Sequence, residues 1–459
     1  MHAQSSNLKP GNIDPFFVDS NTSNDDMFLP IAVRKDKRTC TQHPISKFVS
    51  NHRLSPTFKS FVSQLSTIEI PKNVNEALDN PNWKEAMLEE MRALKRNKTW
   101  EIVDLPKGKK PVGCKWIFTL KYKADGSLER YKARLVARGF TQTYGIDYQE
   151  TFAPVAKMNS IRILISLATN MNWTLQQLDV KNAFLHGDLD EEVYMEIPPG
   201  VNNKMEGKVC RLRKSLYGLK QSPRAWFGKF TKAMMKIGYR QSQGDHTLFI
   251  KHKAPSKVTA LIVYVDDIIV TGNDQEEIKR LKQYLASEFE IKDLGRLKYF
   301  LGIEVAYSKA CVILSQRKYT LDLLKETGML GSKPADSPIE PNHKLGDDPE
   351  KPKVDKERYQ RLVGRLIYLS HTRPDIAYAV SVISQFMHAP RENHMEAAYR
   401  VLRYLKSAPG KGIIFRKSEK MEVEAYTDAD WAGSARSNLW LLDQVLRQNS
   451  DQWLKVYVS

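Results

Sequence analysis

The sequence LIVYVDDIIV at residues 261–270 decides how the rest of this chain is interpreted. Two short apolar, β-branched runs flank the adjacent acids Asp266 and Asp267, with no proline or glycine inside. Such runs are typical of buried strands, and the break between them predicts a tight hairpin. Neighbouring carboxylates at a buried hairpin tip repel each other and resist desolvation, so we expect a cation there, and hard oxygen ligands suit Mg²⁺. The alternative is a solvated Asp-Asp turn.

A second acidic site lies upstream and favours the cation-binding interpretation. The sequence LDV at residues 178–180 predicts the end of a strand at Asp179, and an aromatic residue, Phe184, follows five positions later. A carboxylate at one strand end, facing a carboxylate pair on a hairpin, is the arrangement that two-metal phosphoryl transfer requires. The two ions of such a site lie about 3.5–4 Å apart.

Further short motifs occur in a fixed order along the chain. They are KW at 115–116, KARLVARGF at 132–140, ETFAPV at 150–155, QLDV at 177–180, SLYGLKQ at 215–221, YVDD at 264–267, YFLG at 299–302 and TRPDI at 372–376. Together they resemble the reverse transcriptase region of Ty1/copia-type retrotransposon Pol polyproteins. The likeness extends from about residue 43 to about residue 433. This many ordered matches is specific, whereas Asp-Asp alone would not be.

The resemblance implies a fold of the α/β (α+β) class, the right-hand polymerase with fingers, an antiparallel-sheet palm and a helical thumb or connection. The N-terminal segment is polar and rich in Ser, Asn and Pro, a composition that is typical of disorder. We expect these regions: 1–72, largely disordered; 73–170, fingers; 171–305, palm with the catalytic aspartates and primer grip; 306–420, thumb or connection, with a Pro-rich linker near 331–357; and 421–459, a truncated ribonuclease H start with a divergent tail.

The implied activity is RNA-directed DNA polymerase. A primer 3′-hydroxyl would attack a deoxynucleoside triphosphate on an RNA or DNA template, with Asp179 and Asp266 holding two Mg²⁺ ions (Mn²⁺ being the alternative) and Asp267 assisting. The alternative from another class is a catalytically inactive nucleic-acid-binding relic of a retrotransposon polyprotein. A third hypothesis is a purely structural remnant. Other element-encoded proteins or further copies of the chain are expected as partners.

The resemblance also assigns residues that contact the nucleotide. Cations of the fingers hairpin would hold the triphosphate, although spacing does not decide among Lys121, Lys132, Arg134 and Arg138. Lys132 and Arg134 are two apart on a predicted strand and therefore share a face. Phe184 would be the steric gate that excludes a 2′-hydroxyl, or else an ordinary core residue.

Two further groups complete the expected site. Tyr217 and Gln221 would lie near the template base or nucleotide sugar, with simple packing as the alternative for Tyr217, and Gly218 would allow a close backbone approach there. Phe300, Leu301 and Gly302 would form the primer grip, or else a plain strand-to-turn corner. Lys292 is the nearest match to the family's pyrophosphate-protonating lysine, although exposed lysines are common.

Helix signals frame these motifs. A helix is predicted from Pro81, another over 159–170, one opened by Ser222 as N-cap with Pro223, one over 276–289, and three beyond the linker. The last of these, 393–407, carries cations at a spacing that fits a phosphate backbone. They are Arg400, Arg403 and Lys406.

Bulk properties limit the remaining possibilities. The formal net charge of +18 and pI of about 9.4 favour a polyanionic partner. Four scattered cysteines without CxxC spacing indicate neither a disulfide framework nor a zinc site. No apolar run reaches membrane-spanning length and no signal pattern is present. We therefore expect an intracellular protein, cytoplasmic (in a virus-like particle by family analogy) or nuclear, that is not secreted and does not contact membranes.

The likeness to the family ends close to the C-terminus. The sequence EAYTDADWAG at 424–433 resembles the first strand of the family's ribonuclease H domain, with Asp428 as a vestigial metal ligand. After about Ser434 the other carboxylates of that domain have no counterpart, and one aspartate cannot hold two metals. We predict no ribonuclease H activity. Nor is any protease, integrase or capsid portion visible.

Overall fold

The computed structural model describes residues 69–122, 127–201, 207–253, 255–343, 345–346 and 350–418. The chain divides into two units, residues 1–71 with 120–130, and residues 72–119 with 131–459. The second unit holds nearly all of the described residues, and the architecture below is that unit's own. It combines helices with antiparallel sheets, which confirms the expected α+β class.

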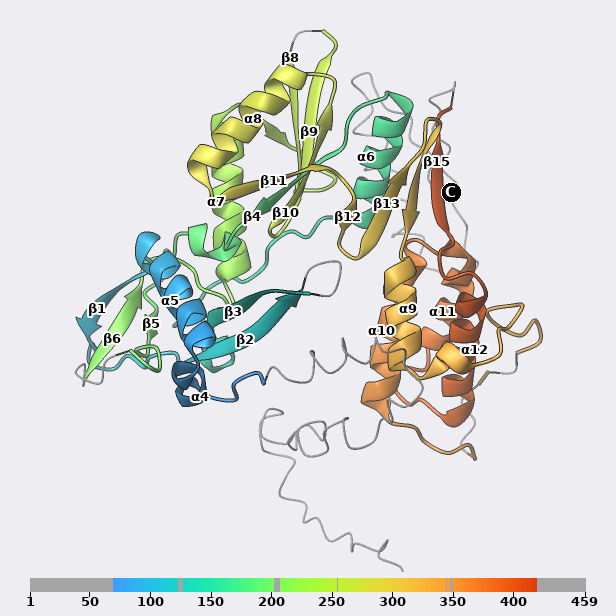
Figure 1. Ribbon diagram of the computed structural model, residues 1–459, viewed down its shortest axis with the longest axis horizontal. Coiled ribbons are helices and arrows are strands. Elements are labelled where there is room, and N and C mark those ends of the chain that lie inside the picture. Colours follow the sequence, from blue (N-terminus) through green and yellow to red (C-terminus); the bar gives the residue numbers. More distant parts are fainter. Residues whose placement is uncertain are drawn as a thin grey trace, which may run out of the picture. The chain divides into compact units, whose positions relative to one another are not determined.

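A six-stranded antiparallel sheet lies at the centre of the second unit, in the order β11-β4-β10-β9-β8-β7 (Figure 1). Its strands are β4 (Gln176–Val180), β7 (Arg240–Gln241), β8 (Leu248–Lys253), β9 (Lys257–Tyr264), β10 (Asp267–Gly272) and β11 (Ile291–Arg296). The decisive sequence at 261–270 supplies the end of β9 and most of β10, so the predicted hairpin is confirmed.

Side chains of β9 and β10 alternate between two apolar cores, as strand geometry requires. Leu261 and Ile268 pack with α7 (Ser222–Lys236) and α8 (Gln275–Glu288) on one side of the sheet. Ile262 and Ile269 pack with α6 (Met158–Asn170) on the other. The apolar runs of β9 and β10 do not alternate with polar residues, because both faces of the sheet are buried there. A search for alternating apolar and polar residues would not have found these strands.

Further short elements lie in the N-terminal half of the chain. Trp83 on the helix that begins at Pro81 contacts the rings of Phe118 and Tyr131 edge-on, at 5.5 and 4.8 Å between centroids. Asn80 caps that helix by accepting hydrogen bonds from the next turn, so its predicted start is confirmed, whereas the short helix before it was not predicted. The elements are α4 (Val74–Asp79), α5 (Pro81–Arg96), β1 (Trp100–Asp104), β2 (Cys114–Tyr122), β3 (Leu128–Ala137), η3 (Gly139–Thr141), η4 (Ala183–His186), β5 (Tyr194–Met195) and β6 (Lys208–Leu212).

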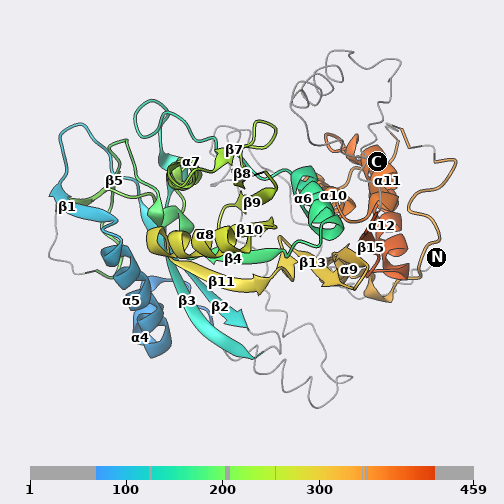
Figure 2. The ribbon, with the colours of Figure 1, turned by 90° about the horizontal axis from the view of Figure 1, so that it is seen from above.

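The C-terminal part combines a four-stranded sheet, in the order β12-β13-β14-β15, with a helical bundle. Pairing of β15 with β14 joins residues about a hundred positions apart, which no local pattern predicted. The elements are β12 (Tyr299–Phe300), β13 (Ile303–Tyr307), β14 (Cys311–Ser315), α9 (Arg317–Glu326), η5 (Met329–Gly331), α10 (Lys356–Ser370), η6 (Pro374–Ile376), α11 (Ala377–Ser384), α12 (Glu392–Ser407) and β15 (Gly412–Arg416). Figure 2 shows these elements from above.

Two local predictions were wrong. Ser222 is the first residue of α7 rather than its N-cap, because its hydroxyl donates to the Leu216 carbonyl at 2.6 Å and Gln221 takes the cap position. The Pro-rich stretch is also more than a linker, because Ile339 and Leu345 pack against the core of the helical bundle.

The cations of α12 also differ from expectation. Arg400 donates to Glu340 Oε1 at 2.9 Å and to Ser337 Oγ at 3.1 Å, and Lys406 donates to the Ser332 carbonyl. These side chains therefore bind the Pro-rich stretch and are not left available for a phosphate backbone.

Among the described residues, no helix combines the length and the apolar composition that a membrane span requires. The predictions for residues 1–68 and for Asp428 lie outside the described residues.

Candidate active site at the β4–β10 strand ends

The fold brings the three predicted acids to one place. In the antiparallel pairing of β4 with β10, Asp179 lies directly opposite Asp267. On the other side of β10, Asp267 pairs with Tyr264, so that Val265 and Asp266 form a two-residue turn. The backbone N–H of Val180 donates to the Asp266 carbonyl at 2.8 Å and holds that turn beside β4. Pairing of the backbones therefore gathers acids that are far apart in the sequence.

The turn itself carries an unusual backbone conformation. Val265 has a φ of +53°, a left-handed value that β-branched residues rarely adopt. The Trp226 indole N–H, from α7, donates to the Val265 carbonyl at 2.8 Å and fixes this conformation. Strain of this kind costs about 1–3 kcal/mol and is found mainly where function requires it.

Electrostatics mark the same place as a concentration of negative charge. Burial, and then the neighbouring Asp266, raise the pKa of Asp179, while Lys292 opposes the shift. Burial also raises the pKa of Asp267, and Asp266 and Asp179 add to the effect. The charges of Lys292, Lys132 and Lys181 lower the pKa of Asp179 but do not cancel the rise. A bound cation would relieve this repulsion.

These residues fit a hard divalent ion by their chemistry. All three offer carboxylate oxygens, the ligands that Mg²⁺ prefers, and the facing strands supply them from both sides. The described part of the chain nevertheless contains no group of three or more His, Cys, Asp or Glu side chains already arranged around a metal position. Backbone pairing thus brings the acids together, whereas their side chains do not form a preformed ligand shell.

Lys292 lies closer to this site than its sequence position suggested. It is the β11 residue that pairs with Asp179 of β4, so Asp179 has Asp267 on one neighbouring strand and Lys292 on the other. Its role as a proton donor stays a prediction.

The predicted nucleotide residues form a second cluster. Lys132 and Arg134 lie on the less buried side of β3, while Ala133 and Leu135 are buried, so the shared face is confirmed. The Arg134 guanidinium lies 3.8 Å from the centre of the Tyr217 ring. Tyr217 in turn meets Phe184, on η4, edge-on at 5.0 Å between centroids. Burial raises the pKa of Tyr217 to about 12, so its hydroxyl remains neutral.

Gly218 has a packing role that the sequence did not reveal. Its φ is +93°, and a Cβ there would lie 2.1 Å from the Ala137 carbonyl oxygen, a close approach that only glycine permits. The Ala137 N–H donates to the Tyr217 carbonyl at 2.8 Å. The glycine therefore allows the loop to pack on the end of β3, and its approach to a base or sugar stays a prediction.

Gln221 lies in a hydrogen-bond network of its own. Gln221 is 2% exposed, accepts from Gln142 Nε2 at 3.0 Å and donates to the Asp147 carbonyl at 2.9 Å. This network explains the residue by packing, and a nucleotide contact stays a prediction. Lys121 is exposed and belongs to the first unit.

The predicted primer-grip residues form the turn of the β12–β13 hairpin. Phe300 is buried and pairs with Ile303, while Leu301 (φ +50°) and Gly302 (φ +78°) turn the chain. The Leu301 carbonyl accepts from the Tyr368 hydroxyl on α10.

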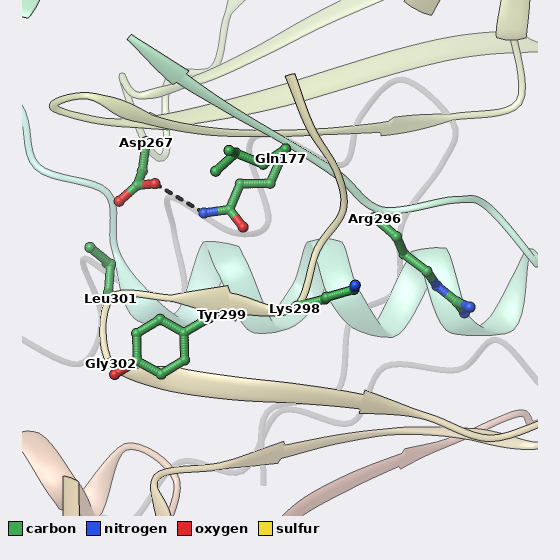
Figure 3. Close-up of a pocket in the computed structure, with 8 residues that line it drawn as sticks. Gln177, Asp267, Arg296, Lys298, Tyr299, Leu301 and Gly302 are labelled. Atoms are coloured by element: carbon green, nitrogen blue, oxygen red, sulfur yellow. Dashed lines mark hydrogen bonds between the residues drawn. The ribbon is translucent and has the colours of Figure 1, made fainter. Parts of the chain in front are cut away.

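A pocket of about 550 Å³ lies between this hairpin and Asp267 (Figure 3). Asp267 and Gln177 line one side and hairpin residues line the other. Its lining is completed by Tyr299, which belongs to the YFLG motif, and by three residues that sequence reasoning missed, Leu294, Arg296 and Lys298. Of the lining residues outside the predicted site, Gln177 is the one that the sequence could have indicated. It lies two positions before Asp179 on a predicted strand, and residues at that spacing share a face.

Comparison with known families agrees with this geometry. Residues 97–341 match the reverse transcriptase (RNA-dependent DNA polymerase) family, which is more than half of the chain. The chain belongs to this family. This reverse transcriptase region is 45% identical over 381 residues to the Retrovirus-related Pol polyprotein from transposon RE1 of Arabidopsis thaliana, covering 83% of this chain and 26% of that protein.

Other relatives of this reverse transcriptase region give the same result. The Pol polyprotein from transposon TNT 1-94 of Nicotiana tabacum is 42% identical, covering 79% of this chain and 28% of the relative. A transposon Ty5-1 protein of Saccharomyces cerevisiae is 33% identical, covering 55% and 82%. The chain thus spans about a quarter of the length of the plant relatives. A solved foamy viral protease-reverse transcriptase in complex with double-stranded DNA is 12% identical with a TM-score of 0.37, covering 72% of this chain and 49% of that one.

Proposed function

We propose that this chain catalyses RNA-directed DNA synthesis, adding deoxynucleotides to a primer on an RNA or DNA template. The observation that carries the proposal is the pairing of Asp179 with Asp267 across β4 and β10, with Asp266 in the adjoining turn. Two-metal phosphoryl transfer needs carboxylates from separate strands converging at one point. A structural acid cluster would instead be expected to pair with cations.

In this proposal Asp179 and Asp266 hold Mg²⁺, or alternatively Mn²⁺, and Asp267 assists. When bound, the ions would activate the primer 3′-hydroxyl and stabilise charge on the leaving pyrophosphate. The protein's own contribution is to fix the acids: β4 and β10 align Asp179 with Asp267, and the bond from Val180 N–H to the Asp266 carbonyl fixes the turn.

Substrates would be held from two sides of the acids. Lys132 and Arg134 would bind the triphosphate, with Arg134 oriented by its contact with Tyr217. Phe184, supported edge-on by Tyr217, would lie under the sugar and exclude a 2′-hydroxyl. The β12–β13 hairpin, which lines the pocket beside Asp267, would support the primer end. We infer that fingers, palm and thumb correspond to residues 73–170, 171–305 and 306–420.

The net charge of +18 supports a template and primer as partners. The likeness to retrotransposon Pol polyproteins supports an intracellular site of action. The same charge also favours the second candidate, a nucleic-acid-binding relic without activity. That candidate predicts strongly salt-dependent binding of an RNA–DNA duplex with no extension.

Primer extension by the purified full chain on an RNA template, with deoxynucleotides and MgCl₂, tests the proposal. The wild type should extend the primer, and the Asp266→Asn, Asp267→Asn double variant should not. Asp293→Asn is the matched control, because Asp293 is an acid on neighbouring β11 whose charge is already paired with Lys282 at 2.7 Å. Extension by the wild type no better than by the double variant would reject the polymerase function.

A further inference from the structure

Gln177 is a buried polar residue of the central sheet. It is only 6% exposed and lies on β4, two residues before Asp179 and therefore on the same face of the strand. Its partner across β10 is Ile269, a fully buried member of an apolar core. Burying an amide here costs free energy unless its polar atoms are satisfied, so packing alone does not explain a glutamine.

The hydrogen bond made by this amide is directed at the acids. Gln177 Nε2 donates to Asp267 Oδ1 at 3.0 Å, as the dashed line in Figure 3 shows. Asp267 is the diagonal neighbour of Gln177, since Asp267 pairs with Asp179 and Ile269 pairs with Gln177. Side chains as long as glutamine reach across such diagonals. The donor comes from a strand that is paired on both sides, with β10 and β11, so it can fix the direction of the carboxylate.

The three acids are therefore held differently. Asp267 is the one whose side chain accepts a hydrogen bond from another side chain, and it lines the pocket that faces the β12–β13 hairpin. Hydrogen bonds to a charged acceptor are roughly twice as strong as neutral ones, which suits an orienting contact. We propose that Gln177 is a positioning residue that holds the Asp267 carboxylate in its working direction at the wall of this pocket.

This inference rests on the proposed polymerase function for its kinetic consequence, but not for the contact itself. Gln177→Met keeps the length and approximate volume of the side chain and removes the donor. Gln176→Met is the matched control, because Gln176 is the adjacent glutamine on β4 and its amide donates to Thr174 Oγ1 at 3.2 Å, away from the acids.

The first measurement is a double-mutant cycle of Gln177→Met with Asp267→Ala, read as urea unfolding of the metal-free protein. If the amide holds the carboxylate, the two changes are coupled by about tenfold in the unfolding equilibrium constant. The pair Gln176→Met with Asp267→Ala should show no coupling. Additive effects of Gln177→Met and Asp267→Ala would overturn the inference, and this readout does not require any polymerase activity.

The second measurement is steady-state primer extension. Gln177→Met should lower kcat at least about tenfold with little change in the KM for dNTP, because a misdirected carboxylate affects the reaction more than nucleotide binding. Gln176→Met should match the wild type. Coupling in the unfolding cycle with an unchanged kcat would show a purely structural hydrogen bond and overturn the inference. Absence of extension by the wild type would reject the polymerase function instead, while the cycle would still report on the contact.

Discussion

Aspartates in two regions of this molecule have opposite electrostatic surroundings. In the helical bundle, Asp375 accepts from Arg373 Nε and Nη2 and from the Tyr404 hydroxyl, each at 2.9 Å, and Lys411 lies 3.3 Å away. These partners hold the pKa of Asp375 at about 2. In the central sheet, burial and like charges raise the pKa of Asp179 and Asp267.

Under the proposed function, the difference is one between a structural acid and a metal-binding acid. Arg373 is 1% exposed. It pairs with Asp375 before α11 and also donates to the Ala408 carbonyl after α12, so both charges stabilise the fold. Burial and mutual repulsion disfavour the charged forms of Asp179 and Asp267, and shifts of this kind cluster at functional sites. Both motifs, TRPDI and YVDD, were recognised in the sequence, but only the partners around them show which role each has.

The largest effect is expected for Asp266→Asn. Removing one carboxylate should abolish the proposed metal-dependent step, which is worth several kcal/mol, and lower the primer-extension rate by about a thousandfold or more. The same change should raise the urea midpoint of unfolding, because Asp266 raises the pKa of both Asp179 and Asp267 by repulsion. A variant in which both activity and stability are reduced would show that the Asp266 charge does not destabilise the fold.

Asp375→Asn should produce the opposite combination. It leaves the buried Arg373 guanidinium without its counter-charge and should reduce the free energy of unfolding by about 3 kcal/mol, measured by urea denaturation. The control is Glu340→Gln, because Glu340 is 66% exposed and its pair with Arg400 should contribute no more than about 1 kcal/mol. Equal losses for the two variants would show that Asp375 is not a structural centre.

Phe184→Val tests whether the aromatic contacts beside the acids set substrate choice. Shortening the ring should reduce discrimination against ribonucleotides by up to about a hundredfold, read as the ratio of kcat/KM for dNTP and rNTP. Tyr217→Phe retains the ring that supports Phe184 at 5.0 Å and should leave that ratio nearly unchanged. Unaltered discrimination in Phe184→Val would assign Phe184 to the core alone.

The smallest effect concerns pH. The folded-state pKa of Asp375 is about 2 against an ordinary 3.8, so its stabilisation is complete above about pH 4 and is lost as the pH falls toward 2. The wild type should lose about 2 kcal/mol more than Asp375→Asn over this interval, measured by urea unfolding at several pH values. Asp179 and Asp267 act with the opposite sign, since protonation relieves their repulsion. Parallel curves for wild type and variant would contradict the assignment.

Local sequence was sufficient for much of the architecture. The β9–β10 hairpin followed from two apolar runs around Asp266 and Asp267, and the start of α5 followed from Asn80 and Pro81. These features depend on neighbours in the chain. The N-cap of α7 was misplaced because a tertiary contact, from Ser222 to the Leu216 carbonyl, took the hydroxyl that would have capped it.

The sequence by itself determined which acids and rings this protein has and that they belong to a reverse transcriptase, because motif order and apolar periodicity are properties of the chain. Tertiary structure alone decided that Asp179 lies opposite Asp267 and that Gln177 donates a hydrogen bond to Asp267. It also decided that Gly218 serves the packing on β3. The physical reason is that strand register and loop packing join residues through space, and no spacing along the chain specifies which strand lies beside which.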